Sequence, residues 1–292
     1  MRGLGAEVLV APPTTKATLD LGSMLDDVCL PVKVYFGHVL ELYRQVDYIF
    51  APRIVSVAAG QYSCPQIIGM PDLLRSNIDG LPPMIDVGVN LRQGRRSLMQ
   101  AVASVGRIFG KNWLASLYAW CRACRRPAAP PLPRPGRAAA AGAADTSPAV
   151  ARLRVGLIGH PYIIYDQQIS MGIIDKLDSL KVDVVTPEMV DRRQAEAAAR
   201  LLDKKIFWST SSRAAGAALA LLCAAPPVAG LIFMTSFSCG PDALIGELIK
   251  QRAQTHNIPC LLLTMDEHTA EAGFLTRLEA FTDMLHRREK RA

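Results

Sequence analysis

Beyond residue 150 the chain alternates short, mostly apolar segments with longer amphipathic segments, and this alternation limits the possible folds more than any other feature. The apolar segments predict strands at residues 153–159, 182–186, 205–208, 230–235 and 258–264. The segments between and after them have helical periodicity and predict helices at residues 169–180, 192–202, 213–223, 242–255 and 270–288. Near-continuous apolar strands separated by amphipathic helices are typical of a parallel sheet covered by helices on both faces.

The first 125 residues show the same alternation less regularly. We expect strands at residues 6–11, 48–51 and 84–87, and helices at residues 32–45 and 95–124. The sequence therefore predicts an α/β fold with two doubly wound, parallel-sheet domains of the Rossmann or flavodoxin type. Ligands of such sheets gather at the carboxyl ends of the strands, so the residues that directly follow strands are the candidates for a site.

Residues 126–150 are rich in Arg, Pro and Ala, a composition that favours extended backbone over a packed core. We interpret them as a linker between an N-terminal domain of residues 1–125 and a C-terminal domain of residues 151–292. Most of the formal charge of +7 lies near this linker, because residues 122–154 hold seven arginines and one acid, Asp145. Such a segment can bind anions weakly, but a solvated linker is the favoured interpretation, and we expect no nucleic-acid partner.

No segment has the roughly 20 uninterrupted apolar residues of a membrane span, and residues 1–5 lack the apolar block of a signal peptide. We therefore expect a cytoplasmic protein with no membrane partner. The seven cysteines are then expected to be reduced thiols rather than a disulfide framework.

Three of these cysteines, Cys29, Cys64 and Cys239, lie at predicted turns, and a proline follows each within two residues. A thiolate next to a helix N-terminus is stabilised by the partial positive charge there, and Gly240 removes a side chain where a bulky group would need room. Three thiolates can bind three irons of a [4Fe–4S] cluster and leave the fourth iron open. From the residues alone, three buried turn cysteines remain the alternative, because the spacing is unlike that of a ferredoxin.

The other four cysteines are weaker candidates. Cys121 and Cys124 form a C-x-x-C pair that could be half of a zinc site or a redox pair, but they end a predicted helix and no second pair accompanies them. Cys223 and Cys260 lie in an apolar helix and an apolar strand, where packing in the core is the better interpretation.

Two ionisable residues, His160 and Glu267, are candidates for proton transfer because each closely follows a predicted strand. A structural turn histidine is an equal alternative for His160, and Asp266 or Thr269 near Glu267 could instead cap the next helix. In the first domain, Lys33 could meet a phosphate or a cluster's negative charge, although a solvated helix face is the favoured interpretation for Lys33 and His38.

Several local motifs together resemble the CoA enzyme activase uncharacterised domain family. They comprise residues 29–33 with 37–38, 47–53, 62–65 with 69–72, 159–162 with 165–166, 237–242, 266–269 and 276–281. These motifs occur in order along most of the chain outside the linker. The chain opens near the family's second strand, at residues 4–8, so we expect the N-terminal domain to lack the family's first strand and helix.

This family is related to the cluster-bearing subunits of 2-hydroxyacyl-CoA dehydratases and benzoyl-CoA reductases, and to double-cubane reductases. The resemblance implies a [4Fe–4S] cluster, or half of a double-cubane cluster, on Cys29, Cys64 and Cys239 in a cleft between the domains. It implies an oxygen-sensitive dehydratase or reductase that accepts a low-potential electron from an ATP-hydrolysing activase and passes it to a bound substrate such as an acyl-CoA, with His160 or Glu267 handling protons. It also implies assembly into a homo- or hetero-oligomer.

Two other functions remain open at this point. The first is a non-catalytic electron-transfer or activase-related accessory protein for such a dehydratase. The second is a zinc-binding or purely structural α/β protein.

Overall fold

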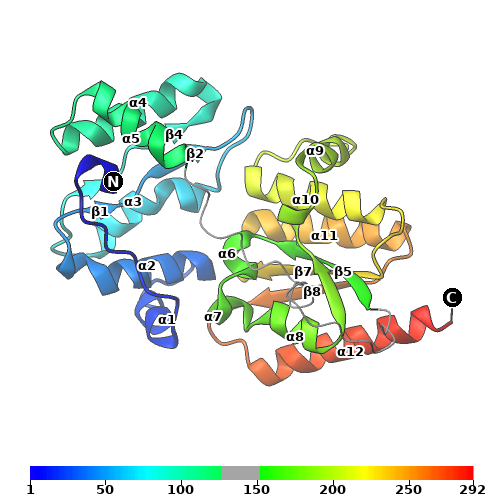
Figure 1. The fold of residues 1–292 in the computed structure, drawn as a ribbon. Helices are drawn as coiled ribbons and strands as arrows, with labels where there is room; N and C mark the ends of the chain where they lie inside the picture. The colour runs from blue at the N-terminus through cyan, green and yellow to red at the C-terminus, as the bar shows by residue number, and fades with distance from the viewer. Residues whose placement is uncertain (126–151, 292) are drawn as a thin grey trace, which may run out of the picture. The chain divides into compact units, whose positions relative to one another are not determined.

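The computed structural model describes residues 1–125 and 152–291, which form two compact units (Figure 1). The N-terminal unit contains Met1–Val28, residues 32–125 and Ile206–Ser209. The C-terminal unit contains Cys29–Pro31 and, among the remaining described residues, 152–205 and 210–291. The predicted linker, residues 126–150, lies outside the described residues.

The C-terminal unit is built on a four-stranded parallel sheet of β5 (Leu153–Gly159), β6 (Val182–Val185), β7 (Gly230–Ser236) and β8 (Cys260–Met265). The strand order is β6-β5-β7-β8, and all neighbouring strands are parallel. All seven residues of β7 and six of the seven residues of β5 are buried, which explains why these strands were recognisable as nearly continuous apolar runs.

The helices of this unit cover both faces of the sheet. They are α6 (Pro161–Ile164), α7 (Gln167–Ser170), α8 (Ile173–Ser179), η5 (Pro187–Met189), α9 (Arg192–Arg200), α10 (Ser209–Leu222), α11 (Gly240–Thr255) and α12 (Glu271–Glu289). Figure 1 shows α10 and α11 on one face and α8 and α12 on the other. The prediction of a doubly wound, parallel sheet is confirmed for this unit.

Two predictions within residues 152–291 were wrong in detail. The helix expected at 169–180 is two helices, because Met171 and Gly172 both adopt positive φ angles, 52° and 63°, and interrupt the helical backbone. The strand expected at 205–208 does not form, and Trp208 makes only a single parallel bridge to Tyr62. The segment is short, begins with the charged Lys205, and leaves the side chain of Phe207 61% exposed, so it has no buried face to stabilise a strand.

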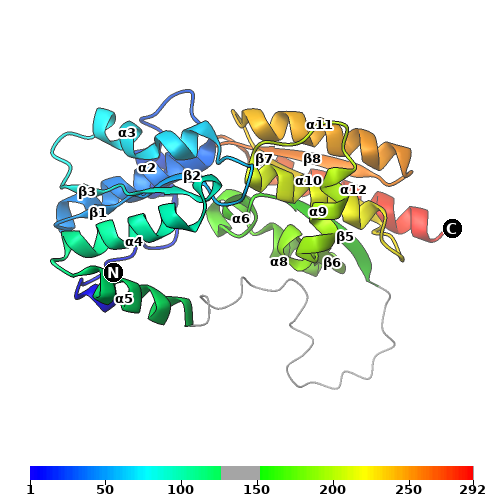
Figure 2. The ribbon, with the colours of Figure 1, turned by 90° about the horizontal axis from the view of Figure 1, so that it is seen from above.

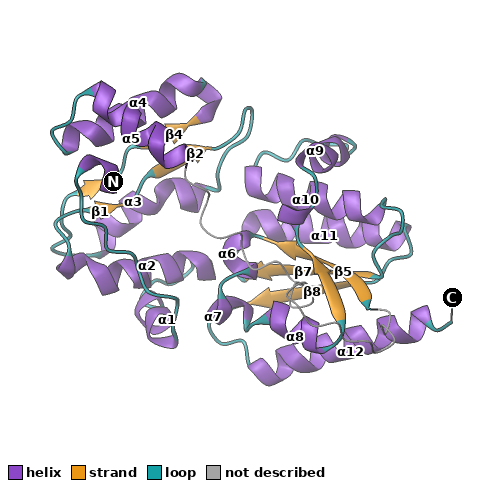
Figure 3. Cartoon of the chain, in the orientation of Figure 1, coloured by secondary structure: helices purple, strands orange, loops and turns teal. Residues whose placement is uncertain are grey.

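The N-terminal unit also has only parallel strand pairs, but its strands are short (Figure 3). β1 (Ile49–Phe50) pairs with β3 (Met84–Ile85), and β2 (Arg53–Ser56) pairs with β4 (Gly88–Asn90). The helical segments are η1 (Arg2–Leu4), α1 (Lys16–Gly22), α2 (Leu30–Leu42), η2 (Tyr43–Gln45), α3 (Pro65–Asn77), η3 (Leu91–Gln93), α4 (Arg95–Ile108) and α5 (Trp113–Arg125).

The strand expected at residues 6–11 does not form, and Leu9 and Val10 are 51% and 70% exposed. Apolar composition alone is therefore misleading here, because no described strand hydrogen-bonds to this segment. The single helix expected at 95–124 is the pair α4 and α5, which lie side by side (Figures 1 and 2) and are separated at Gly110, where φ is 65°. No described helix is both long and apolar enough to cross a lipid bilayer.

Candidate metal site

The three cysteines singled out from the sequence occupy equivalent positions at the starts of helices. Cys64 is the N-cap of α3 with Pro65 next to it, Cys239 is the N-cap of α11 with Pro241 in its first turn, and Cys29 directly precedes α2. All three thiols are partly buried and none forms a disulfide. The N–H groups at a helix N-terminus carry partial positive charge, so the three thiols have similar electrostatic surroundings.

The backbone next to Cys239 is open at Gly240. A Cβ atom placed on Gly240 would meet no atom within 4 Å. Ser238 adopts a φ of 62°, and the backbone N–H of Cys239 donates to the carbonyl of Ser236 at 3.2 Å, so a tight turn joins β7 to α11. The position of Gly240 is therefore open, and room for a bulky group beside the thiol stays a prediction.

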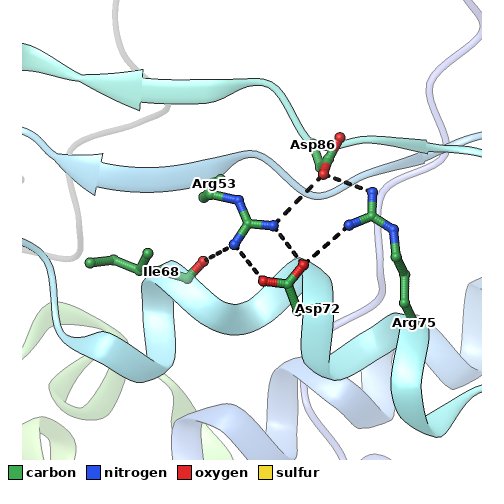
Figure 4. A network of polar contacts seen from close by, with 5 residues as sticks. All are labelled: Arg53, Ile68, Asp72, Arg75 and Asp86. Atoms are coloured by element: carbon green, nitrogen blue, oxygen red, sulfur yellow. Dashed lines mark hydrogen bonds and ion pairs between the residues drawn. The ribbon is translucent and has the colours of Figure 1, made fainter.

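A polar network on the surface of the N-terminal unit connects α3, which begins after Cys64, to β2 (Figure 4). The guanidinium of Arg53 on β2 donates to both carboxylate oxygens of Asp72 on α3, at 2.6 and 2.7 Å, and to the carbonyl of Ile68 at 3.1 Å. Ile68 is in the first turn of α3, and its N–H donates to the carbonyl of Cys64 at 3.1 Å. Arg53 thus ties the turn that carries Cys64 to the strand beside it.

The same network shifts the ionisation of its members. The hydrogen bond with Asp72 raises the pKa of Arg53, and the hydrogen bond from Arg53 lowers the pKa of Asp72. Arg75 extends the network by donating to Asp86 at 2.7 Å. All four side chains are at least 27% exposed, so solvent screens these ion pairs.

In the C-terminal unit, His160, Cys239 and Asp242 form a compact group. One donor atom from each residue lies within 4.8 Å of the other two. His160 follows β5, whereas Cys239 and Asp242 follow β7, and these two strands are neighbours in the sheet. The group therefore lies at the carboxyl edge, where parallel sheets gather their ligands.

Asp242 is the centre of the hydrogen bonds in this group and is only 1% exposed. Its Oδ1 lies 2.9 Å from His160 Nε2 and accepts a bond from the Ser211 hydroxyl at 3.2 Å. Its Oδ2 accepts from the Thr235 hydroxyl at 3.4 Å. A carboxylate this deeply buried must be compensated by hydrogen bonds or by opposite charge, and His160 supplies part of that compensation.

His160 is itself 3% exposed, and its ring stacks on Tyr162 with 5.0 Å between centroids. Its Nδ1 is buried and has no hydrogen-bond partner among the described residues. An unsatisfied buried polar atom costs about 1–3 kcal/mol, so this ring is incompletely satisfied by the protein alone.

Glu267 does not join this group. It follows β8 at the same edge of the sheet and is partly buried. Its neighbour Asp266 closes the local turn by accepting from the N–H of His268 at 2.9 Å and the hydroxyl of Thr269 at 2.8 Å. The sequence suggested that Asp266 or Thr269 caps α12. Neither does, because the N-cap is Ala270.

Asp242 is the site residue that the sequence analysis did not identify. In the sequence it appears as an ordinary acid in the first turn of a helix, where negative charge is common. Its place two residues beyond Gly240, in the first turn of the helix that follows the buried strand β7, was the available signal. Asp166, by contrast, caps α7 by accepting from the N–H groups of Gln168 and Ile169, both at 2.9 Å.

The remaining cysteines have different surroundings. Cys121 and Cys124 are exposed on α5. The expectation that Cys223 packs in the core was wrong, because α10 ends at Leu222 and leaves Cys223 exposed, with its Sγ 3.7 Å from His256 Nε2. Cys260 is partly buried, and burial raises its pKa to about 11.

The favoured interpretation of Lys33 and His38 as members of a solvated helix face was also wrong. Lys33 is only 8% exposed. His38 lies between Thr14 and Glu41, with 3.1 Å from a ring nitrogen to each partner, and Glu41 also accepts from the buried hydroxyl of Thr18 at 2.6 Å. These contacts join α1 to α2, so His38 has a structural role.

The fold and the site define an α/β protein with parallel sheets and a possible metal-binding group of His, Cys and Asp. The chain belongs to the CoA enzyme activase uncharacterised domain family, whose model matches residues 1–190. The matched region contains Cys29, Cys64 and His160, whereas Cys239, Asp242 and Glu267 lie beyond it. No curated protein matches this chain.

Proposed function

We propose that this chain is an iron–sulfur protein of the 2-hydroxyacyl-CoA dehydratase or reductase type. In this proposal it accepts a low-potential electron from an ATP-hydrolysing activase and passes it to a bound substrate of the acyl-CoA class. The observation that carries the proposal is the shared position of Cys29, Cys64 and Cys239, each at the start of a helix with a proline in or beside the first turn. The membership in the CoA enzyme activase uncharacterised domain family supports an activase as the electron donor.

The chemistry of the three cysteines supports such a cofactor. Three thiols that share the electrostatic environment of a helix N-terminus suit three iron sites, and the open position of Gly240 would leave room beside one of them. When bound, a [4Fe–4S] cluster with three cysteine ligands supplies one-electron transfer and one iron position that is open to another ligand.

The protein's own side chains would orient the ligands and handle protons. Arg53 fixes the first turn of α3 through Ile68 and thereby holds Cys64. His160 is the better candidate for proton transfer, because it belongs to the group that contains Cys239 and its ring is held by Asp242. Glu267 is a second candidate at the same edge of the sheet.

The first test is the metal content of protein purified without oxygen. We expect brown protein with about four irons and about four acid-labile sulfides per chain, and an electron paramagnetic resonance signal after reduction. Addition of an acyl-CoA should change that signal if the substrate reaches the cluster. Colourless protein with stoichiometric zinc would contradict the proposal.

A set of serine substitutions tests the choice of ligands. Cys29→Ser, Cys64→Ser and Cys239→Ser should each lose most of the iron, because each removes one of three protein ligands. The double variant Cys121→Ser/Cys124→Ser is the matched control, because those thiols are exposed on α5, and it should keep its iron. Full iron in Cys239→Ser, or loss of iron in the control, would show that the ligands were chosen wrongly.

A further inference from the structure

The group of His160, Cys239 and Asp242 is also a set of metal donors that depends on neither Cys29 nor Cys64. All three residues belong to the C-terminal unit, and one donor atom from each lies within 4.8 Å of the other two. The set offers an imidazole nitrogen, a thiolate and a carboxylate. Nitrogen and sulfur donors suit Zn²⁺, Fe²⁺ and Co²⁺, whereas Mg²⁺ and Ca²⁺ prefer sites made only of oxygen.

Whether the His160 ring is neutral or doubly protonated, one of its nitrogens has no hydrogen-bond partner among the described residues. A neutral ring that donates from Nε2 to Asp242 leaves Nδ1 as a buried lone pair with no donor among the described residues. A doubly protonated ring leaves a buried N–H with no acceptor there. A cation on the bare nitrogen supplies the missing partner, and the other nitrogen can keep its bond to the carboxylate.

The hydrogen bond between His160 and Asp242 has the form seen around metal-binding histidines. Such a histidine usually donates its second ring N–H to a carboxylate, which fixes the tautomer and the orientation of the ring. Asp242 is also a deeply buried carboxyl group, and His160 Nε2 lies 2.9 Å from it. A bound cation beside the ring would offset the negative charge of its carboxylate form.

We propose that the C-terminal unit binds one divalent cation of the Zn²⁺ and Fe²⁺ class through the imidazole of His160 and the thiolate of Cys239, with Asp242 orienting the ring. The site goes beyond the proposed cluster, because it requires neither Cys29 nor Cys64. It shares Cys239 with that cluster, so it is a site of the chain when the cluster is not bound. Because the protein supplies two ligands, further positions on the ion stay open to a small anion or a substrate atom.

The test uses the full chain, freed of metal under anaerobic conditions and titrated with Co²⁺. We expect one Co²⁺ per chain, with a thiolate-to-metal charge-transfer band in the near ultraviolet and visible bands of the low-symmetry ion. The double variant Cys29→Ser/Cys64→Ser should bind in the same way. Cys239→Ser should lose the charge-transfer band, and His160→Gln should lose most of the binding.

Two further variants sharpen the result. Asp242→Asn keeps an acceptor oxygen for His160 but loses the charge, so we expect about 10–100-fold weaker binding, as for other residues that orient a metal ligand. Cys223→Ser is the matched control, because Cys223 and His256 also place a thiol near an imidazole, but on the exposed surface. It should bind Co²⁺ with unchanged affinity. Circular dichroism and thermal melting must first show that each variant is folded, and His160→Gln is chosen over alanine for that reason.

An unchanged charge-transfer band in Cys239→Ser would overturn the site, and so would unchanged affinity in folded His160→Gln. Loss of binding in Cys29→Ser/Cys64→Ser would also overturn it, because the ion would then depend on the cluster ligands. Failure of the cluster proposal has a different signature, which is iron-free protein after anaerobic purification. The two proposals can therefore fail separately.

Discussion

The two units hold their candidate metal ligands with opposite kinds of polar contact. In the N-terminal unit, the turn of Cys64 is tied down by Arg53 and Asp72, whose side chains are 27% and 60% exposed. In the C-terminal unit, His160 and Asp242 near Cys239 are 3% and 1% exposed. The first arrangement is an ion-pair network in solvent, and the second is a hydrogen-bonded group inside the protein.

This difference determines how much each contact contributes to stability. Exposed ion pairs are screened by water and salt and contribute little. Breaking a buried polar pair is costly, because the remaining partner has lost its solvation and cannot recover it. We therefore expect substitutions at Asp242 to destabilise the fold far more than equivalent substitutions at Asp72.

The largest expected effect is that of Asp242→Ala. It removes the acceptor of His160, Ser211 and Thr235 together, and we expect it to lower the free energy of unfolding of the C-terminal unit by about 2–4 kcal/mol. Urea unfolding and hydrogen exchange of the β5 and β7 amides would measure it. Asp72→Ala is the comparison from the N-terminal unit and should produce a much smaller change. Equal losses in the two variants would contradict the role assigned to burial.

Thiol reactivity offers a second comparison between buried and exposed groups. Burial raises the pKa of Cys260 to about 11, and only the thiolate reacts with alkylating agents. Near pH 8 the thiolate population of Cys260 should therefore be roughly a hundredfold lower than that of an ordinary thiol. In mass-spectrometric mapping with iodoacetamide, the exposed Cys121, Cys124 and Cys223 should be labelled well before Cys260. Early labelling of Cys260 would mean that β8 opens readily.

The smallest expected effect is the pH dependence contributed by Asp72. Its pKa is lowered in the folded protein by Arg53, so its contribution is present above the ordinary aspartate value of 3.8 and is lost as the pH falls through the lower folded value. The sign is therefore loss of stability in acid. In a plot of melting temperature against pH, Asp72→Asn should slightly reduce the fall at acid pH, and the reduction should be larger at low salt than at high salt. An unchanged fall at acid pH would mean that this pair adds nothing to the stability of α3.

The sequence by itself determined the parallel α/β architecture of the C-terminal unit. β5 and β7 were recognisable because strands covered on both faces must be apolar along most of their length. The sequence also identified three cysteines before helices and the histidine after β5, because Cys followed by Pro and His followed by Pro are local signals. It failed where packing rather than composition decides, as at residues 6–11 and 205–208, which are apolar yet have no sheet to join.

Only the tertiary structure could place Asp242 beside His160. The two residues are separated by most of the C-terminal unit in the sequence, and they meet because β5 and β7 are parallel neighbours whose carboxyl ends share one edge. Burial of both side chains is likewise a property of the packed sheet and its helices, not of either local segment. Residue type predicted which atoms could bind a metal, and strand order decided which of those atoms are close enough to do so.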